Sequence, residues 1–236
     1  AQLPCFTHVR NENPTSAMQR LLNLGMPSAM LTQQYRMPPA LCSVVSAVFY
    51  NDLLVTAEGR NAVGVAAPIR FLAVPNGRSE MPNTAGRGSS IVNREEVRVV
   101  VREAERLRGR YPTDLNLAIL ATYAAQRNAI AEALGDGVAK VLTVDSAQGQ
   151  EFDHVIYSHV ASDPRKLGFT KNANRLCVAL SRAKRALVVV AHPSVVAVIP
   201  ALRAMRAASF EDGDAVRRTL VAAQYDAVLR GVEHGA

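Results

Sequence analysis

The sequence contains no tryptophan and has little of several other features that mark a special class of protein. Only three of its 236 residues are cysteines, Cys5, Cys42 and Cys177, and they form no C-x-x-C pair. A disulfide framework or a zinc site built from them is therefore not expected. No apolar run reaches the roughly 18 to 20 residues of a membrane span, because the longest stretch, 188–202, is interrupted by a histidine and two prolines. We expect no membrane partner and an intracellular protein, cytoplasmic or nuclear.

Acidic residues are outnumbered by basic ones, 20 against 27, and the net charge is +7. Lysine is scarce too, so arginine supplies most of the positive charge. Because a guanidinium binds phosphate in a bidentate manner, the first partners to consider are nucleic acids and nucleotides. The hydrophobic fraction of 49% is ordinary for a globular protein of one large or two small domains. The chain starts at Ala1 rather than Met, without a secretory leader, so we expect a piece of a longer protein.

Predicted strands and helices alternate along most of the chain. The expected strands cover 29–32, 69–74, 115–120, 138–144, 153–159 and 186–191. The expected helices cover 16–24, 40–50, 94–108, 124–134 and 172–180, and helical patterns return after 193, including 214–230. Asn93 is the expected N-cap of the helix at 94–108, with Glu96 as its capping-box partner. The strands are continuous apolar runs, which predicts an α/β fold: a doubly wound, mostly parallel sheet with helices on both faces and a helical C-terminal tail.

Ligands of such sheets bind where strands end, so polar residues next to strands are the candidate site residues. Arg36 follows the first predicted strand, Thr122 and Tyr123 follow the third, and Arg182 stands before the last. Residues 145–151 after the fourth strand contain Asp145, Ser146, Gly149 and Glu151. Each of these has an ordinary structural explanation when taken singly: a turn or cap, a positive φ, a half-buried aromatic ring or a solvated arginine. Their clustering at strand ends is the more informative observation.

Five short segments resemble, in order and spacing, the motifs of superfamily 1 helicases of the nonsense-mediated-decay type. QQYRMP at 33–38 resembles motif IV, TVDSAQGQE at 143–151 resembles motif V, and NRLCVALSRAK at 174–184 resembles motif VI. VNREE at 92–96 and ATYAAQ at 121–126 are similar to the L-N-x-x-E and T-P-Y-x-x-Q segments that lie between them. The chain departs from the family by having Pro38-Pro39 where His-Pro is usual and Ala121-Thr122 where Thr-Pro is usual. The resemblance covers about 22–192.

The resemblance implies two stacked RecA-like domains with ATP between them and a nucleic acid strand across both. The chain has no G-x-x-x-x-G-K-[ST] phosphate loop and no Asp-Glu pair after an early strand. It is therefore expected to be the second RecA-like domain, with residues 1–28 as an interdomain connector, 29–193 as the domain and 194–236 as a helical C-terminal extension. On its own, this chain should not hydrolyse ATP.

The resemblance also implies a role for each matching residue. Arg36 and Arg182 match arginine fingers, and Gln2 matches a sensor of the γ-phosphate or of the attacking water. Tyr35, Gly149 and Glu151 match nucleotide-binding positions, with Tyr35 beside the adenine and Glu151 at the ribose. Thr122, Tyr123, Thr143 and Ser146 match contacts to the strand backbone. The implied cofactors are ATP and Mg²⁺, the latter held mainly by the first domain.

Three interpretations remain open at this point. The first is the motor domain of an ATP-dependent helicase that moves 5′ to 3′, with single-stranded RNA or DNA, the first RecA-like domain and regulatory proteins as partners. The second is a helicase-derived binding module without ATP turnover, and the third is a helicase-fused nuclease, ranked low because no nuclease spacing of carboxylates and lysine is evident. RNA and DNA are not distinguished, because contacts to a strand backbone are largely independent of sequence.

Overall fold

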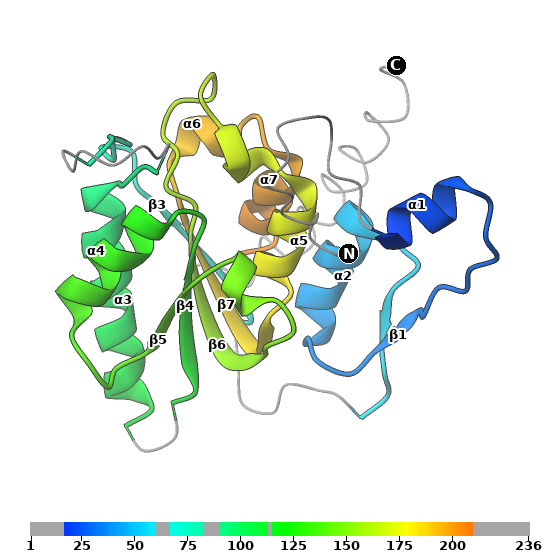
Figure 1. Ribbon diagram of the computed structural model, residues 1–236. Coiled ribbons are helices and arrows are strands. Elements are labelled where there is room, and N and C mark those ends of the chain that lie inside the picture. The colour runs from blue at the N-terminus through cyan, green and yellow to red at the C-terminus, as the bar shows by residue number, and fades with distance from the viewer. Residues whose placement is uncertain (1–16, 60–66, 83–89, 113–114, 210–236) are drawn as a thin grey trace.

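The centre of the molecule is a five-stranded sheet in which every neighbouring pair is parallel (Figure 1). The computed structural model describes residues 17–59, 67–82, 90–112 and 115–209. The strand order is β3-β7-β6-β4-β5, which confirms the predicted α/β class and mostly parallel sheet. The strands are β3 (Ile69–Ala73), β4 (Leu117–Ala121), β5 (Lys140–Thr143), β6 (Phe152–Ser158) and β7 (Ala183–Ala191).

Helices cover both faces of this sheet, as predicted. α3 (Arg94–Arg110) and α4 (Ala124–Leu134) lie on one face, to the left in Figure 1. α2 (Pro39–Phe49), α5 (Ala173–Leu180) and α7 (Pro200–Ala207) pack on the other. Every residue of β4 is buried, with Ala118 and Leu120 in one core and Leu117, Ile119 and Ala121 in the other. The alternating direction of side chains along a strand thus explains why this sequence is apolar at every position.

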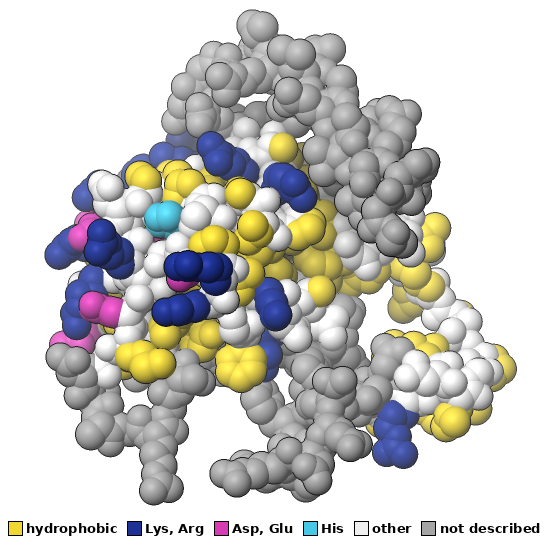
Figure 2. All heavy atoms as spheres, turned by 90° about the horizontal axis from the view of Figure 1, so that it is seen from above, with side chains coloured by type: hydrophobic (Ala, Val, Ile, Leu, Met, Phe, Trp, Pro, Cys, Tyr) yellow, Lys and Arg dark blue, Asp and Glu magenta, His cyan; other side chains and the backbone are white. Residues whose placement is uncertain are grey.

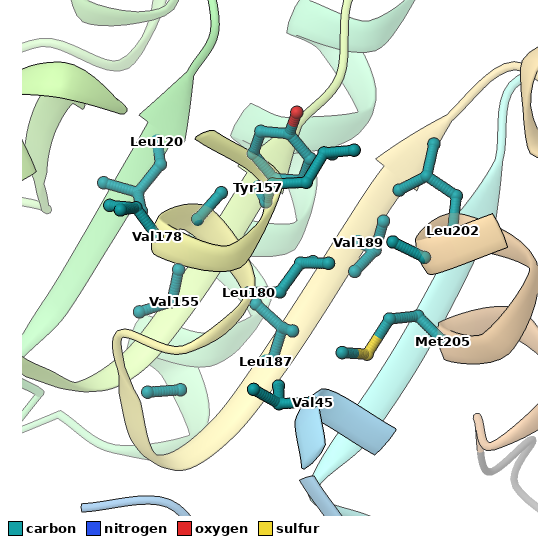
Figure 3. Close-up of a cluster of buried hydrophobic side chains, with 14 of the residues drawn as sticks. Val45, Leu120, Val155, Tyr157, Val178, Leu180, Leu187, Val189, Leu202 and Met205 are labelled. Carbon is teal, nitrogen blue, oxygen red and sulfur yellow. The ribbon is translucent and has the colours of Figure 1, made fainter. Parts of the chain in front are cut away.

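The core on the α5 side contains the larger set of buried side chains. Figure 3 shows the sheet residues Val155, Leu187 and Val189 near Leu180 of α5, Val45 of α2, and Leu202 and Met205 of α7. Leu180, Leu187, Leu202 and Met205 have no exposed surface. This packing fixes α5, and therefore the residues that follow it, against the sheet.

One strand prediction is wrong, although the other elements end within three residues of their predicted bounds. The strand expected at 29–32 is replaced by β1 (Gln33–Gln34), which pairs in parallel with β2 (Val55–Thr56), a strand that the sequence did not suggest. Leu31 is 87% exposed, so this apolar run lies outside the sheet and its hydrophobicity misled the prediction. The shorter elements are α1 (Ala17–Asn23), α6 (Pro193–Val196) and the 3₁₀ turns η1 (Asp145–Ala147) and η2 (Gly168–Lys171).

The helical pattern predicted after 193 appears as α6 and α7 within the described residues. The pattern at 214–230, most of the proposed connector at 1–28, and Gln2 lie outside the described residues. In the described ranges, no helix combines the length and apolarity that crossing a bilayer requires.

The predicted cap of α3 is confirmed, but the second half of the capping box is not formed. The Asn93 side-chain oxygen accepts a hydrogen bond from the Glu96 backbone N–H at 3.2 Å. The backbone N–H of Asn93 donates to Gln126 Oε1 at 2.8 Å, instead of to the Glu96 carboxylate. Glu96 Oε2 instead accepts from Ser158 Oγ at 2.7 Å and from the Val160 N–H at 2.9 Å. The cap therefore also ties α3 to the segment that follows β6.

Candidate nucleotide and nucleic-acid site

The two predicted functional arginines meet at the edge of the sheet where β6 and β7 begin. Arg36 lies in the turn after β1, and its Nε donates to Glu151 Oε2 at 3.0 Å. Arg36 Nη1 also donates to the Ser181 carbonyl oxygen at 3.3 Å, while Arg182 Nη2 donates to the Ser181 hydroxyl at 2.9 Å. Ser181 is therefore the point on which both guanidinium groups converge.

The expected position of this cluster at the carboxyl ends of the strands is wrong. Glu151 directly precedes β6 and Arg182 directly precedes β7, so both lie at the amino ends of these strands. Thr122 and Tyr123 follow β4 at the opposite edge, and Thr143 is the last residue of β5. In a parallel sheet all strands start at one edge and end at the other. The candidate residues consequently form two groups on opposite edges of one sheet.

Backbone carbonyl groups hold Arg182 in place at the end of α5. Its Nε donates to the Val178 carbonyl at 3.0 Å, and its Nη1 donates to the Gln150 carbonyl at 3.3 Å. Burial, together with the nearby positive charge of Arg36, lowers the pKa of Arg182 to about 10, so the group stays charged at neutral pH. Two guanidinium groups that are partly removed from water repel each other. An anion at this place would be favourable.

The turn that carries Arg36 is shaped by the side chain of Gln34. Its Oε1 accepts from the backbone N–H groups of Arg36 at 2.8 Å and Met37 at 2.7 Å. Its Nε2 donates to the Met37 carbonyl at 2.9 Å and to Thr56 Oγ1 on β2 at 2.7 Å. Gln34 was not a predicted site residue, although it lies within the segment QQYRMP that resembles motif IV. It positions Arg36 by fixing the backbone on either side of it.

Tyr50, at the C-terminal end of α2, was also missed by the sequence analysis. Its hydroxyl oxygen lies 3.6 Å from the Cys177 Sγ, which donates to it. Burial is the main reason why the pKa of Tyr50 rises to about 12, and the positive charges of Arg182 and Arg36 act in the opposite direction. The phenol therefore remains neutral beside the two arginines at physiological pH.

The other two predicted nucleotide-binding residues have open surroundings. Tyr35 is 68% exposed, and its hydroxyl donates to Gln33 Oε1 at 2.9 Å. Gly149 has a φ of +79°, a conformation that favours glycine, and no atom lies within 4 Å of where a Cβ would be. The exposed Tyr35 ring is available for contact with a flat ligand.

The residues predicted to contact the nucleic acid lie together on the side of the sheet where the β-strands end, because Ala121 of β4 is in register with Thr143 of β5. The Thr143 and Ser146 hydroxyl oxygens are 2.8 Å apart, and the Ser146 N–H donates to Thr143 Oγ1 at 3.2 Å. Thr122 Oγ1 is 3.1 Å from the hydroxyl of the buried Tyr157, so its hydroxyl is partly engaged within the protein. Thr143 and Ser146 are the more exposed hydroxyl pair.

An ion pair between Asp145 and the largely buried Arg175 links the motif V segment to α5. Arg175 donates to both carboxylate oxygens of Asp145, from Nε at 2.9 Å and from Nη2 at 3.1 Å. Only 10% of the Arg175 side chain is exposed. Asp145, which the sequence offered only as a turn residue, thus fixes η1 against the helix that leads to Arg182.

Within the described ranges, no group of three or more His, Cys, Asp and Glu side chains is arranged to hold a metal ion. A magnesium ligand set is therefore not assigned to these residues.

Comparison with known proteins gives a match to the family described as "AAA domain" over residues 14–194. The chain is 31% identical over 206 residues to "Helicase required for RNAi-mediated heterochromatin assembly 1" of Schizosaccharomyces pombe, covering 82% of this chain and 20% of that protein. It is 30% identical over 197 residues to "ATP-dependent helicase NAM7" of Saccharomyces cerevisiae, covering 75% and 20%. The chain thus spans about a fifth of the length of these relatives.

Among solved structures, the chain is similar to the C-terminal domain of a possible DNA helicase from Lactobacillus plantarum. The TM-score is 0.49 at 17% sequence identity, with 73% of this chain and 94% of that chain covered.

Proposed function

The chain belongs to this AAA domain family, its relatives are superfamily 1 helicases, and we propose that it is the second RecA-like motor domain of an ATP-dependent nucleic-acid helicase. In this proposal Arg36 and Arg182 are arginine fingers that face ATP held by a first RecA-like domain. Magnesium is held mainly by that other domain, and the present chain alone does not hydrolyse ATP.

The observation that carries the proposal is the convergence of Arg36 and Arg182 on Ser181. Cleavage of the γ-phosphate spreads negative charge over the transferred group, and preorganised cations that meet this charge lower the barrier. Carbonyl groups aim Arg182, and the Gln34 turn aims Arg36, so neither guanidinium must be ordered at the moment of reaction. The pairing of Arg36 with Glu151 holds the arginine until phosphate oxygens replace the carboxylate.

The remaining predicted residues are assigned around this centre. Tyr35 contacts the adenine, Glu151 accepts from the ribose hydroxyls, and Gly149 gives the chain the turn that brings Glu151 to β6. Gln2 keeps its assignment as a sensor of the γ-phosphate or of the attacking water. Tyr35 is supported by its exposed ring, and Glu151 by its position beside Arg36.

A single strand of RNA or DNA is assigned to the opposite edge, with backbone contacts from Thr122, Tyr123, Thr143 and Ser146. Neutral hydroxyls and backbone N–H groups position phosphates without reading the bases. Residues 144–151 connect the carboxyl end of β5, where the nucleic acid is assigned, to the amino end of β6, where the nucleotide is assigned. This connection contains Asp145 and Glu151. This connection offers a short physical route between ATP turnover and movement along the strand, 5′ to 3′ by family resemblance.

Steady-state ATPase kinetics of the intact helicase test the arginine assignment. Arg36→Ala and Arg182→Ala should each lower kcat by about 10³-fold, because an arginine finger acts mainly on the transition state. The matched control is Arg185→Ala, which removes an exposed arginine three residues further along and should leave kcat unchanged. Near-normal kcat in folded Arg36 and Arg182 variants would favour the alternative, a nucleic-acid-binding module without productive turnover.

A further inference from the structure

Phe169 is an aromatic residue with no assigned role, on the side of the sheet where the β-strands end. It lies in η2, in the connection from the carboxyl end of β6 to α5, and it is 50% exposed. An exposed phenylalanine is costly to hydrate, and among the described residues only Tyr35 has a more exposed aromatic ring. Its position beside Tyr123 places it at the edge to which the nucleic acid strand is assigned.

Three contacts hold the Phe169 ring in one place. The Phe169 backbone N–H donates to the Tyr123 hydroxyl at 3.3 Å, and the two ring centroids are 6.2 Å apart at a tilt of 48°. The guanidinium carbon of Arg175 lies 4.9 Å from the Phe169 ring centroid. Arg175 is itself fixed by the bidentate pair with Asp145. The ring is therefore preorganised, yet half of the residue stays open to solvent.

The backbone around Phe169 leaves little room for another arrangement. Gly168 has a φ of +52°, and a Cβ at this position would lie 2.7 Å from the Tyr123 hydroxyl oxygen. A side chain here would be strained by the positive φ and would require the Tyr123 hydroxyl to shift, so glycine suits the close approach of η2 to Tyr123. The local sequence thus brings the aromatic ring of η2 next to a residue already matched to strand binding.

Basic residues lie close to Phe169 in the sequence. The segment 159–172 contains Arg165, Lys166 and Lys171, all exposed, and its single acidic residue, Asp163, pairs with Arg165 at 3.1 Å. Figure 2 looks down on the end of the molecule that carries α6 and shows Lys and Arg side chains spread over this face with few acidic ones. An exposed aromatic ring close to basic side chains suits a nucleic acid strand, because the ring can stack on a base while the cations contact phosphates.

We propose that Phe169 is a base-stacking platform for the single strand, held from behind by Arg175 and from the side by Tyr123, with Lys166 and Lys171 contacting the flanking phosphates. This inference rests on the proposed function and adds a contact to bases where the motif residues contact only the backbone. Stacking on an aromatic ring accepts every base, so the platform contributes affinity without sequence specificity.

Fluorescence anisotropy with the 236-residue chain tests the platform. Phe169→Ala should weaken binding of an oligo(dT) or oligo(U) strand by about tenfold, since the energy of one stacked base is lost. Binding of an abasic oligonucleotide of the same length, which retains the phosphates but has no bases, should change by less than about twofold. Phe169→Leu keeps an apolar side chain against Tyr123 and should lose the same base-dependent part, whereas Phe169→Trp should retain it.

Lys171→Ala is the matched control, because a lost phosphate contact should weaken the base-bearing and the abasic strand equally. Thermal melting of each variant identifies loss of folding, and Phe169→Leu decides the question if Phe169→Ala melts early. Equal loss on both strands, or no loss in folded Phe169→Leu, overturns the platform alone. Failure of the unsubstituted chain to bind either oligonucleotide at low salt overturns both the platform and the nucleic-acid site in the proposed function.

Discussion

At the scale of single residues, two fully buried titratable groups, Glu96 and His159, lie close to the carboxyl end of β6. Glu96 of α3 receives hydrogen bonds from Ser158 and Val160, but burial dominates and raises its pKa to about 7. His159 follows β6 and is fully buried, with backbone groups of Thr170 and Ala161 beside its ring. Burial lowers the pKa of His159 to about 4. Both groups are therefore mostly neutral near pH 6 in the folded protein.

The two groups act on stability in opposite directions. The raised pKa of Glu96 gives stability that is complete below about pH 4.5 and is lost as the pH rises to about 7. The lowered pKa of His159 gives stability that is present above 6.5 and is lost as the pH falls to about 4. Much of the pH dependence that each group causes is hidden by the other between these values.

Glu96→Gln should expose this hidden dependence, since glutamine cannot ionise. Relative to the unsubstituted chain, the free energy of unfolding of the variant should increase by about 3 kcal/mol as the pH rises from 4.5, the ordinary pKa of the Glu96 carboxyl, to about 7, its pKa in the folded protein. Urea denaturation at several pH values gives this difference, in which the other titrating groups cancel. Glu95→Gln, which changes the neighbouring carboxylate, is the control for replacing a carboxylate by an amide. A constant difference for Glu96→Gln would mean that Glu96 does not titrate in this range.

At the scale of helices and strands, the pattern of apolar residues located the elements, but it did not show on which side of the sheet the neighbouring polar residues lie. The buried strands and the cap of α3 could be predicted because apolar runs and Asn93 act locally. Arg182 lies at the amino end of β7 because it precedes that strand, whereas it was expected at the carboxyl ends of the strands. The contact of Arg36 with Glu151 spans 115 residues and has no local signal.

The pair Asp145–Arg175 shows how an element is positioned by a contact that no motif announces. Asp145→Asn should lower the free energy of unfolding by about 2 kcal/mol, because it leaves the buried Arg175 charge without its carboxylate. The control is Glu95→Gln, which breaks the exposed pair with Arg98 and should cost less than about 0.5 kcal/mol. Equilibrium urea unfolding measures both. Similar values for the two variants would show that the Asp145 contact is energetically no different from a surface pair.

At the scale of the whole molecule, the sheet separates two kinds of chemistry. The arginine cluster lies where β6 and β7 begin, and the predicted strand contacts lie where β4 and β5 end. Membership of the family and the fold could be predicted from five short motifs, since their order and spacing constrain the whole domain. The separation of the two groups was missed although a parallel sheet was expected, because residues that precede a strand and residues that follow one were treated alike.

Binding of single strands by this chain should be weak and steeply dependent on salt. The proposed contacts are largely to phosphates, so counterion release should dominate, with the logarithm of the affinity falling by about 0.7 per contacted phosphate for each tenfold rise in salt. Anisotropy titrations across a salt series measure this slope, and Lys171→Ala should reduce it by about one contact. Tight binding that does not respond to salt would contradict a backbone-tracking surface.

The most direct test of the arginine site compares a ground-state nucleotide with a transition-state mimic in the intact helicase. ADP with aluminium fluoride imitates the phosphoryl group during transfer, whereas ADP alone does not. Arg182→Ala should weaken binding of the mimic by about 10³-fold and leave the affinity for ADP nearly unchanged, because the guanidinium meets charge that exists only during transfer. If a folded Arg182→Ala variant binds the mimic as tightly as the unsubstituted enzyme, Arg182 is not an arginine finger and the proposed motor role of this domain is contradicted.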